Sequence, residues 1–267
     1  SKANSTFLIQ FFSNPKVRLS GFGKGQTFLG STSVTTDANG YAYFTSRCNV
    51  AVRNGNLITA TATAYATNAI NINANVPATS NPWLAGMPSG TYANVGNPHN
   101  NPDKAPAESP VLVTGVTLAA GMSLNFASIS GNGTNDPSIK MSGPDGDPNN
   151  IVRNFKGDEN GMSSLAAPIN SLVAVFLDDS QPNLSAAPNM LDFSTTSSRN
   201  FPTLGPQLKQ PCFIGDGKND SGVTQQFVVP AGATRLYLCS MDGYEWNNNS
   251  GGRVVQATQP ATITLVQ

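Results

Sequence analysis

Residues 228–252 read VVPAGATRLYLCSMDGYEWNNNSGG and combine a turn, a strand and a polar loop. The opening Pro-Ala-Gly is a turn signal, because proline presets one turn angle and glycine permits the others. Residues 234–239 contain enough apolar, aromatic and β-branched side chains to predict a strand. The loop that follows holds one carboxylate, Asp242, and three consecutive asparagines, residues 247–249.

This loop offers oxygen atoms to a hard cation. Ca²⁺ prefers carboxylate, amide and backbone carbonyl oxygens, and a short loop of this composition can supply several of them. The loop contains no cysteine or histidine, so zinc and copper are not expected. On composition alone, a solvated Asn/Gly turn is the simpler interpretation.

The Asp followed by Asn-Asn-Ser-Gly resembles the calcium and sugar loop of the LecA-type galactose-binding bacterial lectins. In that family a calcium ion binds two vicinal hydroxyls of the sugar directly. The resemblance implies that Asp242, Asn248 and Asn249 hold Ca²⁺ by their side chains and contact the sugar. It also implies a backbone carbonyl ligand at Trp246.

The resemblance implies further ligands from earlier in the chain. The family's remaining calcium ligand is a backbone carbonyl just after an early strand, which is expected here at Asn132 or Thr134. The acidic loop at residues 143–150 matches the place of the family's other sugar contacts. There Asp147 or Asn150 would touch the sugar.

The aromatic residues of the C-terminal loop have two interpretations. Trp246 and Tyr244 could present an aromatic face to the apolar side of a sugar ring, which provides contact area at a low entropy cost. Equally, Trp246 could belong to the core. The only histidine, His99, lies in a Pro/Asn loop and is expected at the plain surface.

Composition limits the classes of partner. The 267 residues include 15 basic and 15 acidic ones, and only 11% are charged, against a usual value of about 25%. A neutral, charge-poor surface argues against nucleic acid and anionic membranes as partners. No apolar run is long enough to insert into a membrane. We expect an extracellular or cell-surface protein.

The first part of the chain predicts a small antiparallel β domain. Residues 6–12, 26–36 and 57–65 have the composition of strands. The tetrapeptide Asp-Ala-Asn-Gly at 37–40 predicts a tight hairpin turn, because Asn-Gly readily adopts positive φ angles. The return strand is expected at 41–45.

Three runs of this part carry a second resemblance: FFSNP at 11–15, SGFGKGQTFLG at 20–30 and VTTDANG at 34–40. They resemble an immunoglobulin-like repeat of large bacterial surface proteins. The resemblance implies an immunoglobulin-like sandwich over residues 1–72. Such repeats begin with one more strand than the stretch that matches here, which suggests an open sheet edge.

The remainder of the chain divides into a linker and a second domain. Residues 73–81 fall in an Asn/Ala/Pro-rich stretch that is typical of a linker. Residues 82–267 resemble the LecA-like domains of secreted bacterial proteins, which implies a β-sandwich and an all-β chain. The supporting runs, besides the C-terminal loop, are DKAPAESP at 103–110, APINSL at 167–172 and FIGDG at 213–217.

Two local features of the second domain are also predicted. Its cysteines are Cys212 and Cys239, and Cys48 lies in the first domain. A Cys212–Cys239 disulfide is favoured because both cysteines flank predicted strands, although three free thiols fit the sequence nearly as well. Residues 163–167 are expected to form a short helical turn.

We expect a binding protein and not an enzyme. The chain lacks the common nucleophile, zinc and phosphate-loop motifs, and a single histidine leaves few bases to activate a nucleophile. The function predicted from the resemblance is calcium-dependent binding of a galactose-type glycan.

The alternative is a structural subunit of a bacterial surface layer or fibre, in which calcium is only structural. It would self-associate through the N-terminal domain by strand exchange. The donor strand would be residues 1–9 or residues 69–76 of a neighbouring copy.

Overall fold

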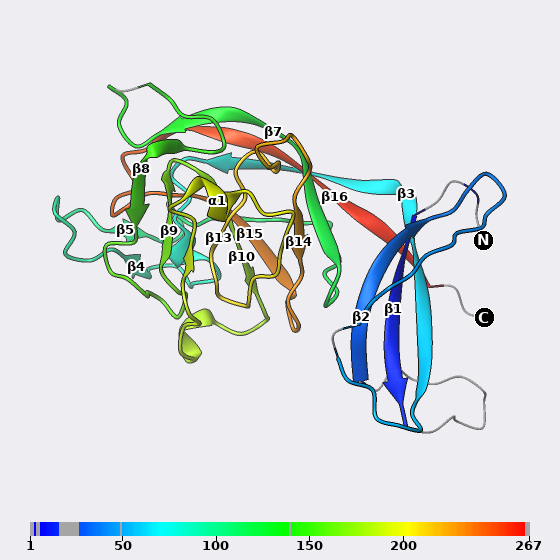
Figure 1. Ribbon diagram of the computed structural model, residues 1–267. Coiled ribbons are helices and arrows are strands. Elements are labelled where there is room, and N and C mark those ends of the chain that lie inside the picture. The colour runs from blue at the N-terminus through cyan, green and yellow to red at the C-terminus, as the bar shows by residue number, and fades with distance from the viewer. Residues whose placement is uncertain (1–2, 4–5, 16–26, 49, 139, 265–267) are drawn as a thin grey trace. The chain divides into compact units, whose positions relative to one another are not determined.

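The computed structural model divides the chain into two compact units (Figure 1). Unit 1 comprises Ser1–Ala69 and Pro260–Gln267, and unit 2 comprises Ile70–Gln259. The residues that the structure describes are 3, 6–15, 27–48, 50–138 and 140–264.

Almost all regular structure in both units is β-strand, which confirms the predicted all-β class. Helical structure in the described ranges consists of the single turn α1 (Thr196–Arg199) and the 3₁₀ turns η1 (Pro82–Leu84) and η2 (Pro182–Leu184). Over the same ranges, no helix has the length and apolar character needed to span a bilayer.

Unit 1 is built on a sheet in which β1 (Thr6–Asn14) lies between β2 (Thr27–Thr35) and β3 (Leu57–Pro77) (Figure 1). Both pairings of β1 are antiparallel. Phe7 of β1 and Val34 of β2 are paired and buried, so the alternating apolar pattern selects the register. The predicted strands at 6–12, 26–36 and 57–65 are confirmed. The described strands of unit 1 form one sheet, whereas a sandwich consists of two packed sheets. The immunoglobulin-like sandwich therefore remains a prediction.

The predicted turn at 37–40 is present, but the return strand at 41–45 is not. The Asp37 carboxylate accepts the backbone N–H groups of Asn39 and Tyr41, and the Gly40 N–H donates to the Asp37 carbonyl. The turn itself therefore uses the amide of Tyr41, and this amide cannot start a ladder with β2. Residues 41–48 have no strand assignment.

The segments proposed as exchanged strands already have partners within the chain. Residues 6–9 pair with β2 and β3 on the two edges of β1. Residues 69–76 belong to β3, which lies between β1 and β16 (Ser250–Thr264) in the strand order. Strand donation by either segment would replace these pairs with pairs to another copy, and it stays a prediction.

The predicted linker at 73–81 is also wrong. β3 continues through Pro77, and Ala74, Val76 and Ala78 are buried. Its Asn-rich composition suggested a loop, but alternate residues supply an apolar face that the core of unit 2 covers. The Ala78 N–H donates to the Gly251 carbonyl, which ties the end of this segment to β16.

The central sheet of unit 2 has the order β13-β10-β15-β6. All six residues of β10 (Leu172–Leu177) are buried. Full burial of each large apolar side chain contributes about 1.5–3 kcal/mol, so β10 is a main source of stability. β10 pairs antiparallel with β15 (Arg235–Ser240), and this confirms the strand predicted at 234–239. The outer strands are β13 (Cys212–Phe213) and β6 (Val111–Leu112).

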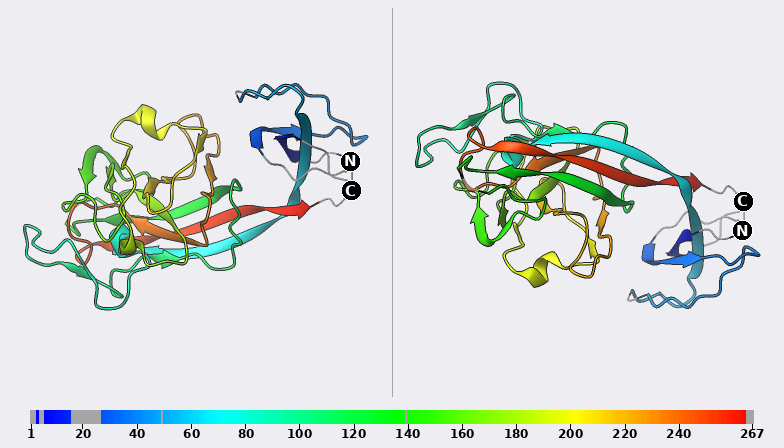
Figure 2. Two further views of the ribbon diagram at one scale, coloured as in Figure 1. Left: turned by 90° about the horizontal axis from the view of Figure 1, so that it is seen from below. Right: turned by 90° about the horizontal axis from the view of Figure 1, so that it is seen from above.

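A second layer of unit 2 gives the fold its β-sandwich-like character. Its strands follow the order β12-β14-β7-β16-β3, and β3, β16 and β7 (Ser123–Thr134) run side by side (Figure 2). Phe126 of β7 and Val255 of β16 join the same buried cluster as Val175 of β10. The short members of this layer are β12 (Thr203–Leu204) and β14 (Gln226–Val228).

Two smaller sheets complete unit 2 and correct two predictions. The helical turn expected at 163–167 is instead the start of β9 (Leu165–Ile169), whose five residues are all buried. The polar loop at 143–150 leads into β8 (Asp147–Arg153), which pairs with β9. The other strands are β11 (Leu191–Asp192), which pairs with β9, and the pair β4 (Tyr92–Ala93) and β5 (Asp103–Lys104).

The predicted Cys212–Cys239 disulfide is absent, and all three cysteines are free thiols. Cys212 pairs with Ala174 and Cys239 pairs with Val173, so the two cysteines flank β10 on opposite edges. Two strand spacings of about 4.8 Å separate them, whereas a disulfide needs Cα atoms within about 7 Å. Burial raises the pKa of the Cys212 thiol to about 12, so it is protonated at neutral pH.

Candidate functional site

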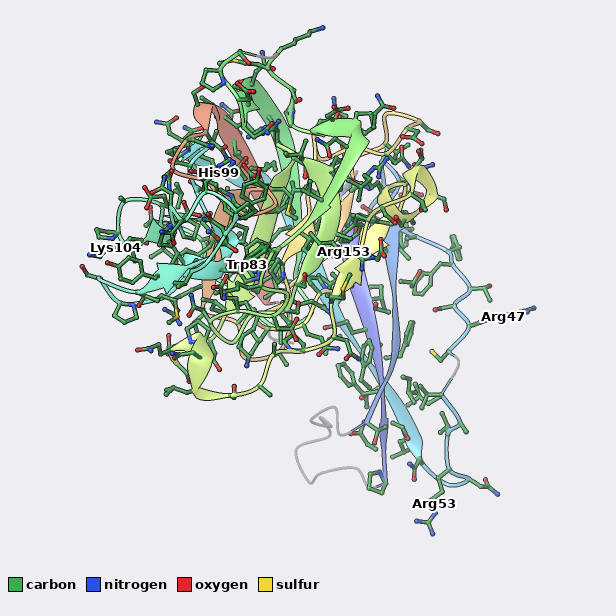
Figure 3. All side chains as sticks on the ribbon, turned by 90° about the vertical axis from the view of Figure 1, so that its left-hand side faces the viewer. Arg47, Arg53, Trp83, His99, Lys104 and Arg153 are labelled. Atoms are coloured by element: carbon green, nitrogen blue, oxygen red, sulfur yellow. The ribbon has the colours of Figure 1, made fainter. Side chains whose placement is uncertain are left out.

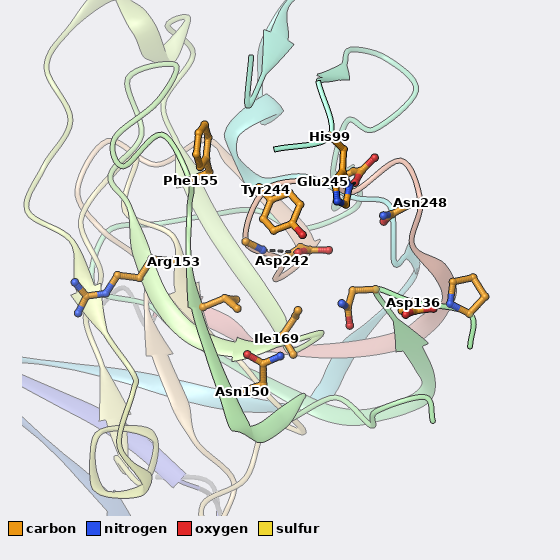
Figure 4. A pocket seen from close by; sticks show the side chains of 14 residues that line it. His99, Asp136, Asn150, Arg153, Phe155, Ile169, Asp242, Tyr244, Glu245 and Asn248 are labelled. Carbon is orange, nitrogen blue, oxygen red and sulfur yellow. Dashed lines mark hydrogen bonds and ion pairs between the residues drawn. The ribbon is translucent and has the colours of Figure 1, made fainter. Parts of the chain in front are cut away.

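Unit 2 contains a pocket of about 550 Å³ beside the loop that follows β15 (Figure 4). Its walls come from that loop, the loop after β7, β8 with the turn that follows it, and the loop that carries His99. Carboxylate and amide groups line one part of the pocket, and Phe155 and Tyr244 line another.

Asp242 lies in the wall of this pocket because β15 ends at Ser240, two residues before it. The Met241 N–H donates to the Ser171 carbonyl, and the Asn170 N–H donates to the Met241 carbonyl, so the chain is held on both sides at this point. The Asp242 side chain is only 5% exposed. Burial raises its pKa to about 7, against the opposing effect of donors that include the Gly243 N–H and the Asn249 side chain.

A second buried carboxylate, Asp103 of β5, holds the loop that follows β15 in its shape. Its Oδ1 accepts the N–H groups of Trp246 at 3.0 Å and Asn247 at 2.9 Å. Its Oδ2 accepts the Asn81 Nδ2–H at 2.9 Å. We call this arrangement the Asp103 clamp. Burial raises the pKa of Asp103 to about 6, although these donors partly offset the effect.

Asn249 supplies an oxygen atom without a partner. Its N–H donates to the Trp246 carbonyl at 3.0 Å, and its Nδ2–H donates to the Ala78 carbonyl at 3.1 Å. Its Oδ1 is buried and accepts no hydrogen bond. Buried polar atoms are nearly always satisfied, so such an atom calls for an explanation.

The buried oxygens of Asp242 and Asn249 fit a hard cation. Asp242 has no ion pair in the part of the chain that the structure describes, and a cation would stabilise its ionised form. Asn248 is exposed and lines the pocket beside them. Within the described ranges, no group of three or more His, Cys, Asp or Glu could hold a metal. A cation here would therefore depend on amide and carbonyl oxygens as well as on Asp242.

The early-strand residues expected to provide a carbonyl ligand, Asn132 and Thr134, do not line the pocket. Gly133 exchanges hydrogen bonds with Ser142, and alternate residues of an antiparallel strand bond in opposite directions. Asn132 and Thr134 therefore face β16, where they pair with Gly252 and Ser250. Because β7 extends to Thr134, the residues that reach the pocket are the next ones, Asn135 and Asp136.

Of the two residues expected to touch the sugar from the acidic loop, one reaches the pocket. Asn150 of β8 lines it, and Asp147 does not. The Asp147 carboxylate accepts the Asn149 N–H at 3.0 Å, so it forms a local Asx turn. Of the two alternatives, Asn150 is therefore the one that the pocket geometry favours.

Trp246 is a core residue, and its predicted role as an aromatic platform for the sugar is wrong. Its side chain is fully buried, with edge-to-face packing on Trp83 at 5.6 Å between ring centroids. Its indole N–H donates to the Ser240 carbonyl at 2.7 Å. The Trp246 carbonyl, expected to bind calcium, accepts the Asn249 N–H and closes the turn.

His99 lines the pocket, contrary to the expectation of a plain surface residue. Its Nδ1 pairs with the Glu245 carboxylate, and its ring meets Tyr244 edge to face at 5.3 Å between centroids. The other Glu245 oxygen accepts the Asn101 Nδ2–H at 2.9 Å. Figure 3 shows His99 and Arg153, another lining residue, on unit 2.

The sequence contained little to reveal these additional residues. His99 is 146 positions from Glu245, and no local motif connects them. Arg153 ends a strand whose position the sequence did not predict, and Phe155 lies in the turn after it. Only Asn135 and Asp136 had a signal, because they come just after an early strand, where a ligand was expected.

No protein-family model, curated protein or solved structure matches this chain. The site's own geometry therefore carries the functional argument.

Proposed function

We propose that this chain binds a galactose-type glycan in the pocket, with Ca²⁺ held by Asp242 and Asn249. The observation that carries the proposal is a pair of buried oxygen groups: Asp242 in the pocket wall, and Asn249, which does not line the pocket but whose side chain donates to Asp242. Asp242 is ionisable but has no cationic partner among the described residues, and the Asn249 Oδ1 accepts nothing. A hard cation would satisfy both groups.

The other lining residues suit a sugar. Asn135, Asn150 and Asn248 offer both donors and acceptors to hydroxyl groups, and Tyr244 offers an aromatic face. When bound, the ion would supply a positive charge to which sugar hydroxyls bind as ligands. The Asp103 clamp supports this role because it holds the loop in one shape before ligand arrives, which reduces the ordering cost of binding. An extracellular or surface location belongs to the same proposal.

The test is a pair of titrations by isothermal calorimetry. Calcium should bind the chelator-treated protein, and methyl β-galactopyranoside should bind only when calcium is present. Asp242→Ala should abolish calcium binding and, with it, sugar binding, since a hard cation depends on its carboxylate.

Asp178→Ala is the matched control. The Asp178 carboxylate accepts the Ser180 N–H in a turn of the same unit, outside the pocket, so its removal should leave both titrations unchanged. Unaltered calcium binding by Asp242→Ala would refute the metal assignment. Sugar binding that survives a chelator would refute calcium dependence.

A further inference from the structure

We infer that the pocket takes at least two linked sugar units, and that the second unit packs on the aromatic ring of Phe155. This inference rests on the proposed function and deepens it. The proposal concerns the sugar at Asp242, whereas Phe155 determines how much of the glycan is recognised.

The first argument is size. A volume of about 550 Å³ lies within the range of pockets that enclose drug-sized ligands, about 300–1,000 Å³. A single hexose, with twelve non-hydrogen atoms, is much smaller than such ligands. If one sugar lies against Asp242, space remains in the pocket for a neighbouring unit.

The second argument is the chemistry of the remaining space. Asp136 and Asn248 lie on one side of Asp242, and Phe155 lies on the other (Figure 4). Phe155 is 48% exposed as a residue, although many other large apolar residues of unit 2 are buried. An exposed aromatic ring in a polar pocket is suited to the apolar face of a pyranose.

The third argument is that Phe155 is rigidly placed beside the site. Its N–H donates to the Gly243 carbonyl at 2.7 Å, so its backbone is bonded to the residue that follows Asp242. The preceding residue, Asn154, is buried and donates to the Gly157 carbonyl at 3.0 Å. Because the backbone is held at this point, the ring projects from a fixed position, which reduces the ordering cost when a ligand packs on it.

The experiment compares lactose, a β-galactosyl disaccharide, with methyl β-galactopyranoside in calorimetric titrations at saturating calcium. Wild-type protein should bind lactose more tightly than the monosaccharide. Phe155→Ala should weaken lactose binding about tenfold and change monosaccharide binding less than about twofold. Phe155→Trp should retain the preference for lactose, and Phe155→Leu, which keeps an apolar side chain without a π face, should lose most of it.

Tyr92→Ala is the matched control, because Tyr92 is 47% exposed and lies outside the pocket. An independent readout is NMR, in which ring currents of Phe155 should shift the glucose protons of lactose upfield in wild-type protein alone. Equal binding of both sugars by wild type, or equal losses for both sugars in Phe155→Ala, would overturn the inference and leave the proposed function intact. If wild type binds neither sugar, the proposed function fails and this inference fails with it.

Discussion

Asp103 and Asp242 are two buried carboxyl groups that contact the same loop, and their surroundings differ in one respect. Asp103 is fully buried and accepts three hydrogen bonds, from two backbone N–H groups and the Asn81 amide. Asp242 is nearly as buried but lies in a pocket wall, beside an amide oxygen that accepts nothing. Burial raises the pKa of both groups.

The difference teaches that a raised pKa does not by itself identify a functional group. At Asp103 the surrounding donors hold the loop in place, so the cost of burying the carboxylate serves the fold. At Asp242 the carboxylate lies in a pocket wall, so a ligand can recover the cost. The two sites should therefore respond differently to the same substitution.

The largest expected effect is on stability, for Asp103→Ala. The substitution leaves three buried donors without an acceptor, and each unsatisfied donor costs about 1–3 kcal/mol. We expect the free energy of unfolding to fall by at least about 3 kcal/mol, measured by urea denaturation of the calcium-free protein. Asp242→Ala should cost less than about 1 kcal/mol, because water in the pocket can replace its oxygens. Equal losses for the two variants would contradict the distinction.

Low pH should favour the buried, protonated form of both carboxyl groups, whereas calcium requires the ionised form of Asp242. A carboxyl whose folded pKa exceeds its unfolded value of 3.8 favours folding when protonated. This contribution is complete below about pH 4 and is lost as pH rises through about 6 for Asp103 and about 7 for Asp242. Calcium requires ionised Asp242, so its affinity should fall about tenfold per pH unit below pH 7.

The measurement is the melting temperature at pH 5 and pH 8, with and without calcium. The stabilisation by calcium should be large at pH 8 and small at pH 5, and Asp242→Ala should remove the difference. The same calcium effect at both pH values would show that Asp242 is not a ligand.

Substitution of Asn249 should reduce calcium affinity more than it reduces stability, and both effects should be smaller than those above. Asn249→Ala removes the unpaired Oδ1 and the hydrogen bond to the Ala78 carbonyl. We expect calcium affinity to fall about tenfold, with a loss of about 1 kcal/mol in unfolding free energy. Asn249→Asp keeps the oxygen and adds charge, so it should bind calcium more tightly than Asn249→Ala. Equal calcium affinities for wild type and Asn249→Ala would remove Asn249 from the site.

The sequence predicted those features of the site whose residues are adjacent in the chain. The strand at 234–239 and the carboxylate and amides after it are contiguous. Their residue types therefore predicted both the strand and the oxygen-rich loop. The structure brings Asp242, Asn248 and Asn150 to one pocket.

What sequence reasoning missed depends on contacts distant along the chain. Asp103 acts on residues 143 positions away, and nothing in its own Asp-Lys-Ala-Pro context marks it as buried. Trp246 was ambiguous because an aromatic residue in a polar loop fits either a platform or a core, and Trp83 on another segment decides the matter. Disulfide pairing failed for the same reason, since strand order determines which cysteines are neighbours.

The smallest expected effect concerns His99, at the rim of the same pocket. Its side chain is 55% exposed, whereas that of its partner Glu245 is 7% exposed, and exposed ion pairs contribute about 0–1 kcal/mol. In His99→Ala, Glu245 keeps the Asn101 hydrogen bond and the Asp103 clamp is untouched. We expect the free energy of unfolding to fall by less than about 1 kcal/mol and calcium affinity to stay unchanged. Sugar affinity should stay within about threefold of wild type, with a small loss because Tyr244 loses one packing partner. The same calorimetric titrations and urea denaturation check this. A loss of calcium binding as large as that of Asp242→Ala would mean that the metal site extends to His99, and that the pocket wall near Glu245 serves the ion and not only the sugar.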